Sequence, residues 1–127
     1  MRYDHEFSIG DRKIGLNEPT YFIADIASSH DGELSRAKDL IWLAKEAGAD
    51  CAKFQHFLAR DIVSDEGFRS LGGQMAHQAA WKQSVYDIFE KYQTPRDWTD
   101  ELVAESKKAD IDFMTTPYDL AAIDLVD

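Results

Sequence analysis

The chain has 127 residues and a formal net charge of −10 at pH 7, a length that suits one domain or a piece of one. The acidic balance argues against nucleic acid as a partner, because phosphate backbones are bound by many lysine and arginine side chains. One cysteine excludes an internal disulfide framework and fits a reducing compartment. No apolar run approaches the roughly 20 residues of a membrane span, and the N-terminal stretch lacks the apolar core of a signal peptide. We therefore expect a soluble, cytoplasmic protein that binds neither nucleic acid nor membrane.

The first elements in chain order are a hairpin, a strand and a helix. Residues 6–15 alternate apolar and polar side chains around a Gly-Asp pair, which predicts a short β-hairpin. The run TYFIADIA, residues 20–27, is apolar and rich in strand-forming residues, so it predicts a strand, and the loop SSHDG follows. From Leu34 onward apolar residues recur at helical spacing until Gly48, which stands at a natural helix stop.

The second half continues this alternation after a long interval. The run DCAKFQ, residues 50–55, predicts a second strand. Residues 56–98 far exceed the about 2 to 6 residues of a typical strand-to-helix loop, so we expect a helical excursion on the catalytic side. Helical spacing there is shown by Trp81, Val85, Ile88, Phe89 and Tyr92. The remaining predicted elements are a helix from Thr99, a strand over residues 112–116, and a helix over residues 120–127.

Alternating strands and helices of these lengths indicate βαβ units, and therefore an α/β fold with a parallel sheet. Such sheets occur in doubly wound layers and in (β/α)8 barrels, and a complete barrel needs about 250 residues. In the barrel case, residues 1–127 would supply only a hairpin and the first three strands. We would then expect the chain to be a fragment of something longer.

Polar side chains stand late in the predicted strands. Asp25 and Lys53 would lie on neighbouring strands, close enough to pair, and Gln55 would share the Lys53 face. Both parallel architectures bind ligands at the carboxyl ends of their strands, so these residues and Thr116 are predicted to converge on one site. The alternative is that Asp25 and Lys53 form a purely structural ion pair.

Three further residues have two interpretations each. Thr116 precedes a proline that must end the strand, and its hydroxyl, with backbone amides at the next helix start, suits a phosphate; alternatively it only caps the turn. His30 in the SSHDG loop is a candidate ligand, although a lone loop histidine is more often a hydrogen-bonded structural residue. Cys51 is predicted to be a small core residue rather than a reactive thiol. The four histidines of the sequence do not cluster at metal-ligand spacing.

Two stretches resemble the sialic acid synthase family, which condenses phosphoenolpyruvate with amino sugars. They are FIADIASSHDGELSRAKDLIWLAKEAGADCAKFQ and DFMTTPYDLAAIDLVD. The family pattern has an Ala-Glu-Ile strand, an Asn-His-x-Gly loop, a Gly-Ala-Asp turn, a Lys-Phe-Gln strand end and a Thr-Pro-Phe-Asp turn. This chain departs from that pattern at Asp25, where the family has Glu, and at Ser29, where it has Asn. These motifs stand in the same order in this chain, and the resemblance covers about residues 20–127.

The resemblance implies a (β/α)8 TIM barrel followed by a small antifreeze-like domain that reaches into the partner's active site in a homodimer. Phosphoenolpyruvate would condense with N-acetylmannosamine or a related amino sugar to form a sialic acid. A divalent metal, Mn²⁺ or Mg²⁺, would polarise the sugar aldehyde through ligands outside this segment. Asp25 and Lys53 would be catalytic, with Lys53 near the phosphoenolpyruvate carboxylate and Asp25 touching the sugar. Gln55 would also bind the sugar, Thr116 the phosphate, and His30 the substrate.

Two alternatives remain open. The chain could be a non-catalytic half-barrel fragment or oligomerisation module, or it could belong to another phosphoenolpyruvate aldol-type synthase. Because three strands of a barrel leave open sheet edges, residues 1–127 alone are expected to associate and to show no synthase activity.

Overall fold

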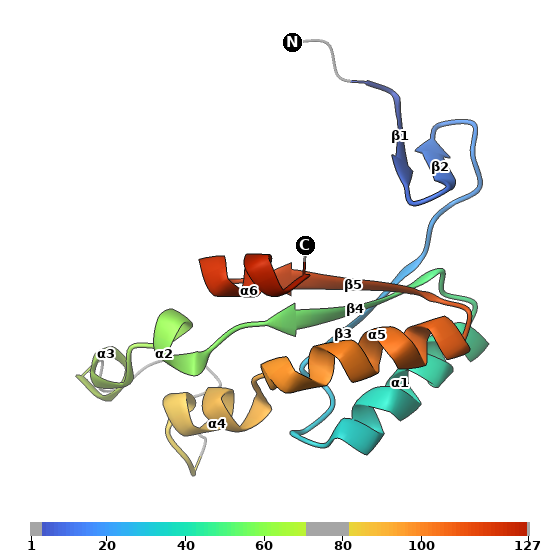
Figure 1. Cartoon of the computed structure of the whole chain (residues 1–127). Coiled ribbons are helices and arrows are strands. Elements are labelled where there is room, and N and C mark those ends of the chain that lie inside the picture. Colours follow the sequence, from blue (N-terminus) through green and yellow to red (C-terminus); the bar gives the residue numbers. More distant parts are fainter. Residues whose placement is uncertain (1–3, 71–81, 127) are drawn as a thin grey trace.

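The computed structural model describes residues 4–70 and 82–126. The chain opens with the expected hairpin, in which β1 (Glu6–Ile9) pairs antiparallel with β2 (Arg12–Gly15). Its two-residue turn is possible because Gly10 adopts a positive φ of 55°, a region that glycine enters without steric cost. The hairpin is a separate two-stranded sheet at the N-terminal end of the parallel strands, to which Arg12 joins it by an ion pair with Asp50 (Figure 1).

The central element is a parallel sheet in the order β3 (Ile23–Ala27), β4 (Cys51–His56) and β5 (Asp112–Pro117). Helix α1 (Leu34–Glu46) connects the first two strands, and α5 (Thr99–Lys108) precedes the third. Both helices cover the same face of the sheet (Figure 1). The predicted βαβ order and the α/β class are therefore confirmed, with parallel strands.

The core lies between this sheet face and the two helices. Phe54 is fully buried and its ring stacks on that of Phe113 at a centroid separation of 5.8 Å. The buried residues of this core come from alternating strand positions, from the inner faces of the helices and from the turn between α5 and β5: Ile26, Ala37, Ile41, Ala44, Ala52, Phe54, Leu102, Ala109 and Ile111. The hydrophobic periods read from the sequence thus identify the buried face.

The first strand of the sheet is shorter than predicted, since it begins at Ile23 rather than at Thr20. The residues before it are held by side-chain hydrogen bonds as well as by backbone bonds from the Asp50 and Cys51 N–H groups to the Phe22 carbonyl. The backbone N–H of Phe22 donates to the Asp50 carboxylate at 2.8 Å, and the Tyr21 hydroxyl donates to Asp112 at 2.6 Å. These bonds hold residues 20–22 in a lead-in segment at the N-terminal edge of the sheet.

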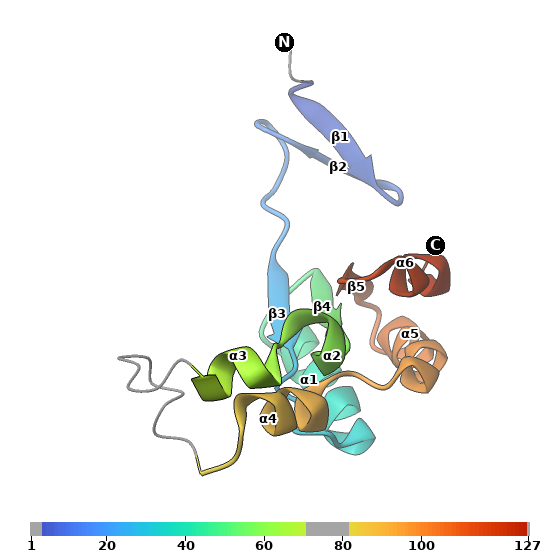
Figure 2. The same cartoon turned by 90° about the vertical axis from the view of Figure 1, so that its left-hand side faces the viewer.

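In its described parts, residues 57–70 and 82–98, the long interval between β4 and α5 contains helices, as expected, and these lie beyond the C-terminal end of β4 (Figures 1 and 2). It contains the short helices α2 (Ala59–Ile62) and α3 (Asp65–Ser70), then α4 (Val85–Tyr92) and a 3₁₀ turn, η2 (Arg96–Trp98). Ser84 caps α4 by accepting a 3.0 Å bond from the backbone of Asp87, so the helix begins later than the predicted stripe. Trp81, the first residue of that stripe, lies outside the described residues.

The last described helix, α6 (Leu120–Val126), follows β5 as predicted. In the described parts of the chain, no helix combines the length and the apolar character that a membrane crossing requires.

Candidate active site

Asp25 and Lys53 lie side by side midway along β3 and β4, on the face opposite to α1 and α5 and next to the C-terminal end of the sheet. They are register partners of β3 and β4, and Lys53 Nζ is 3.4 Å from Asp25 Oδ1. The Asp25 side chain is 57% exposed and that of Lys53 is 26% exposed. The prediction that these two residues are close enough to pair is confirmed, and the pair remains accessible to solvent.

Gln55 and Thr116 extend this group by one further row of the sheet. They are direct register partners of β4 and β5, two positions after Lys53 and Met114. Because side chains alternate along a strand, Gln55 and Thr116 share the face of Lys53. Both are half-buried, and neither side chain makes a hydrogen bond to another described residue. Four predicted residues from three strands thus meet on one sheet face; their chemical roles remain predictions.

His30 does not join this group. Its ring is fully buried, its Nε2 lies 3.0 Å from Thr94 Oγ1, and its Nδ1 accepts from the Gly32 N–H at 3.1 Å. Burial lowers the pKa of His30 below its usual value, which keeps the ring neutral. The Trp98 ring also packs edge-on against it. This placement matches the structural interpretation of His30 and leaves no ring nitrogen for a substrate.

The turn after Thr116 is capped by Asp119, and not by Thr116 as one of its two interpretations held. Asp119 Oδ1 accepts from the backbone of Ala122 at 2.9 Å, and its Oδ2 accepts from Arg96 at 2.5 Å. The Arg96 bond holds the pKa of Asp119 below its ordinary value, with a smaller contribution from the backbone amides. Since Asp119 caps α6, the Thr116 hydroxyl is left available for another partner.

Sequence reasoning missed two features of this edge. His56 is buried at the end of β4, between Thr115 and Thr99. The one sequence signal for this position is the strand alternation, which places His56 on the same helix-facing side as Ala52 and Phe54. Ala27 ends β3 with a positive φ of 51°, at a register shift between Asp25 and Ala27. No local pattern marks an alanine for this conformation.

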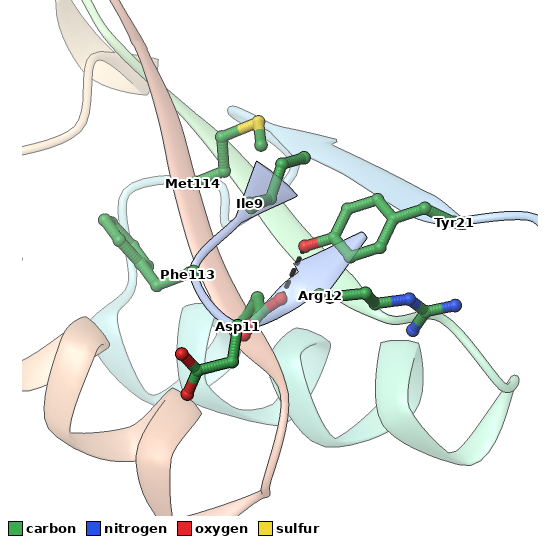
Figure 3. A pocket seen from close by; sticks show the side chains of 8 residues that line it. Ile9, Asp11, Arg12, Tyr21, Phe113 and Met114 are labelled. Carbon is green, nitrogen blue, oxygen red and sulfur yellow. Dashed lines mark hydrogen bonds between the residues drawn. The ribbon is translucent and has the colours of Figure 1, made fainter. Parts of the chain in front are cut away.

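A cavity of about 510 Å³ lies at the opposite end of the sheet, between the hairpin and β5 (Figure 3). Its lining comprises Ile9, Gly10, Asp11, Arg12, Tyr21, Asp112, Phe113 and Met114. Burial, with the hydrogen bond to Asp112, raises the pKa of Tyr21 above its usual range. Arg12 already bonds to Asp50, and Tyr21 to Asp112. We therefore locate the candidate site at the C-terminal end, where Gln55 and Thr116 lie. Cys51, the first residue of β4 at the N-terminal end, is fully buried, and burial raises the pKa of its thiol, as expected of a core residue.

Comparison with known proteins agrees with the motifs. The model of the NeuB family matches residues 40–127. The chain belongs to this family. Over 107 residues it is 33% identical to N,N'-diacetyllegionaminic acid synthase of Campylobacter jejuni, covering 84% of this chain and 31% of that protein. A shorter stretch of 44 residues is 52% identical to human N-acetylneuraminate-9-phosphate synthase, covering 35% of this chain and 12% of that protein.

A solved structure is similar over nearly the whole chain. The N-acetylneuraminic acid synthetase of Leptospira borgpetersenii, in complex with citrate, superposes with a TM-score of 0.71 at 25% identity. The match covers 94% of this chain and 36% of that one. This chain therefore spans about a third of the length of the NeuB-family relatives that it matches.

The NeuB-family chain offers no metal site of its own within residues 4–70 and 82–126. No group of three His, Cys, Asp or Glu side chains there is arranged to hold an ion. Asp25 is the one carboxylate in the four-residue group, and it faces a lysine. A single carboxylate paired with an ammonium group does not fit a divalent cation, which needs several oxygen or nitrogen ligands.

Proposed function

We propose that the protein containing this chain condenses phosphoenolpyruvate with an N-acetylated amino sugar to form a sialic acid or related nonulosonate. Relatives named as legionaminic acid and N-acetylneuraminate-9-phosphate synthases support this reaction class. The observation that carries the proposal is the convergence of Asp25, Lys53, Gln55 and Thr116 on one accessible sheet face.

The arrangement of layers supports a barrel rather than a doubly wound sheet. In doubly wound folds helices cover both faces of the sheet, whereas in a (β/α)8 barrel all helices lie outside. Here α1 and α5 lie on one face, and the strand order follows the chain order (Figure 1). We therefore propose that the described sheet is part of a TIM barrel, with residues 1–127 as its N-terminal segment. The face that carries Asp25 and Lys53 would then line the barrel interior.

Each residue of the group has a role that its chemistry permits. The Lys53 ammonium supplies local positive charge for the phosphoenolpyruvate carboxylate in a chain whose net charge is −10. Asp25 orients that ammonium from 3.4 Å and has exposed oxygen available to accept from a sugar hydroxyl. The Gln55 amide offers a donor and an acceptor to the same sugar, and the Thr116 hydroxyl donates to the phosphate.

The remaining parts of the proposal lie outside the described residues. A divalent ion such as Mn²⁺ or Mg²⁺ would polarise the sugar aldehyde when bound, but its ligands would have to come from elsewhere in the protein. The homodimer and the C-terminal antifreeze-like domain follow from the family resemblance. The proposed cytoplasmic location rests on the single cysteine, which fits a reducing compartment.

The test uses the full-length gene product. Phosphate release and product mass are measured with phosphoenolpyruvate, Mn²⁺, and a panel of N-acetylmannosamine, its 6-phosphate and diacetylated amino sugars. Lys53→Ala is expected to lower kcat/KM by about 100- to 1,000-fold, as for other groups that stabilise reacting anions. Lys45→Ala is the matched control, because Lys45 also pairs with a carboxylate, Asp110, but lies on α1, away from the group.

The outcomes separate the alternatives. Nonulosonate formation that is lost in Lys53→Ala and kept in Lys45→Ala supports the proposal. Consumption of phosphoenolpyruvate only with an aldehyde that lacks an acetamido group would assign another aldol-type synthase. Absence of turnover with every sugar would favour the non-catalytic module. Residues 1–127 alone are expected to be inactive and to sediment as an associated species.

A further inference from the structure

One short segment forms hydrogen bonds to residues at or just after the C-terminal end of each of the three parallel strands. Residues 93–99, here termed the clasp segment, connect α4 to the start of α5. Its bonds to the strand ends are Thr94 to His30 after β3, Gln93 to Ala59 and Thr99 to His56 at β4, and Arg96 to Asp119 after β5. The clasp segment therefore connects the elements that carry the four candidate site residues.

His56 is where the clasp segment reaches the sheet itself. Its side chain is 1% exposed, its Nε2 lies 2.9 Å from Thr99 Oγ1, and its Nδ1 lies 2.6 Å from Thr115 Oγ1. Its backbone carbonyl also accepts from the Tyr118 N–H at 3.0 Å. His56 thus holds the end of β5 on both sides of Thr116, at Thr115 and at Tyr118.

The hydrogen bonds assign the direction of each donor in this network. The Thr99 hydroxyl donates to the backbone carbonyl of Arg96 at 2.8 Å, so its oxygen accepts from His56 Nε2–H. In the neutral ring Nδ1 then carries the lone pair, and the Thr115 hydroxyl donates to it. Burial lowers the pKa of His56, with Arg96 contributing, which agrees with a neutral ring. The two hydrogen bonds fix the orientation of the imidazole ring and of the two threonine hydroxyls. An aliphatic side chain at this position would not orient those hydroxyls.

We propose that His56 is a positioning residue that fixes the Thr116 hydroxyl for its phosphate by holding Thr115 through Nδ1. The inference rests on the proposed function. Thr115 and Thr116 are adjacent on β5 and point to opposite faces, so a bond that fixes Thr115 on the helix side orients Thr116 on the open side. Gln55 precedes His56 and pairs in register with Thr116, so the same bond fixes the relation between those two side chains.

The experiment compares two substitutions at Thr115 in the full-length protein. Thr115→Val keeps the side-chain shape and removes the hydroxyl, whereas Thr115→Ser keeps the hydroxyl. We expect Thr115→Val to raise KM for phosphoenolpyruvate and the inhibition constant of inorganic phosphate by about 3- to 10-fold, the effect of one hydrogen bond. We expect kcat and KM for the amino sugar to change by less than about 2-fold, and Thr115→Ser to stay near wild type.

A second pair of variants tests the same bond from the histidine. The amide oxygen of His56→Asn reaches the Nδ1 position and accepts from Thr115, whereas the longer side chain of His56→Gln reaches the Nε2 position. His56→Asn is therefore expected to keep the low phosphate inhibition constant and His56→Gln to lose it. This pair applies if Thr115→Val does not fold, as judged by circular dichroism.

Three results are decisive. Loss of phosphate affinity in Thr115→Val and His56→Gln, with recovery in Thr115→Ser and His56→Asn, supports the positioning role. If the wild type consumes phosphoenolpyruvate and all four variants have the same phosphate inhibition constant as the wild type, the positioning role is overturned and the proposed function stays intact. A wild type that neither binds nor consumes phosphoenolpyruvate overturns the proposed function together with this inference.

Discussion

The two ends of the parallel sheet both carry acidic residues, but these residues are bonded differently. At the N-terminal end, the Asp50 carboxylate accepts from the Arg12 guanidinium and from the Phe22 N–H. Those bonds hold the pKa of Asp50 below its ordinary value, and the bond from the Phe22 N–H makes the largest contribution. Toward the C-terminal end, Asp25 in the middle of β3 has a 57% exposed side chain and faces Lys53 at 3.4 Å.

This difference separates structure from candidate chemistry more clearly than residue type does. The bonds of Asp50 join the hairpin and the lead-in segment to the sheet, so its hydrogen-bonding capacity serves the fold. Asp25 keeps exposed oxygen, and the neighbouring Gln55 and Thr116 make no side-chain bond to another described residue. Parallel folds bind ligands toward the carboxyl ends of their strands. Polar side chains there that have unused hydrogen-bonding capacity indicate a site better than residue type does.

The largest expected difference between the two ends of the sheet comes from exchanging the two carboxylates for alanine. Asp25→Ala should lower kcat/KM by about 10- to 150-fold, the loss of a hydrogen bond to a charged group. Its stability should change little, because an exposed ion pair contributes only about 0 to 1 kcal/mol. Asp50→Ala should instead lower the melting temperature by several degrees and keep kcat/KM near wild type.

Steady-state kinetics and thermal melting of the same two preparations of the full-length protein measure this contrast. A conservative control is Asp50→Asn, which keeps an acceptor for the Phe22 N–H. Equal loss of activity in Asp25→Ala and Asp50→Ala, at equal melting temperatures, would remove the distinction between the two ends.

Local sequence patterns could predict the C-terminal group because it depends on strand phase alone. Alternation placed Lys53 and Gln55 on one face, and two consecutive parallel strands brought Asp25 beside Lys53. The role of His56 could not be predicted in the same way. Its partners Thr99 and Thr115 are 43 and 59 residues away along the chain, and nothing near His56 indicates them.

The predicted start of β3 at Thr20 was wrong for a similar reason, because the strand begins at Ile23. The run from Thr20 has strand composition, yet the Asp50 side chain, 28 residues later, takes the Phe22 N–H. A competing side-chain acceptor is tertiary information, which a local β-propensity does not contain.

The second prediction concerns pH and distinguishes the two ends by their titrating groups. Burial lowers the pKa of His30 and of His56 from 6.5 in the folded chain. As the pH falls below 6.5, the unfolded chain therefore binds more protons than the folded one, and the free energy of unfolding decreases. The pKa of Asp50 is also lowered, from 3.8, so its contribution is lost in a separate step at lower pH.

Urea unfolding of the protein between pH 4.5 and 7.5 measures the first step. His56→Asn and His30→Asn should each reduce the slope of unfolding free energy against pH, because each removes one buried imidazole. Asp50→Ala should leave the slope in this range unchanged. An unchanged slope in both histidine variants would mean that the clasp contacts do not control stability at mildly acidic pH.

The smallest expected effect concerns the backbone at the C-terminal end. Ala27 has φ 51°, a conformation that costs an L-residue roughly 1 kcal/mol or more, and it lies at the register shift beside Asp25. Ala27→Gly removes that strain but makes the unfolded chain more flexible, so the expected net gain is at most about 1 kcal/mol. Ala47→Gly is the control, because Ala47 is exposed with an ordinary φ of −73° and the same exchange should cost about 0.5 to 1 kcal/mol.

Opposite signs of the two changes in the free energy of unfolding, measured in urea, would show strain at Ala27. A stabilised Ala27→Gly protein with lower kcat/KM would further indicate that this strain holds Asp25 against Lys53, whereas two equal losses of stability would place Ala27 among ordinary strand residues.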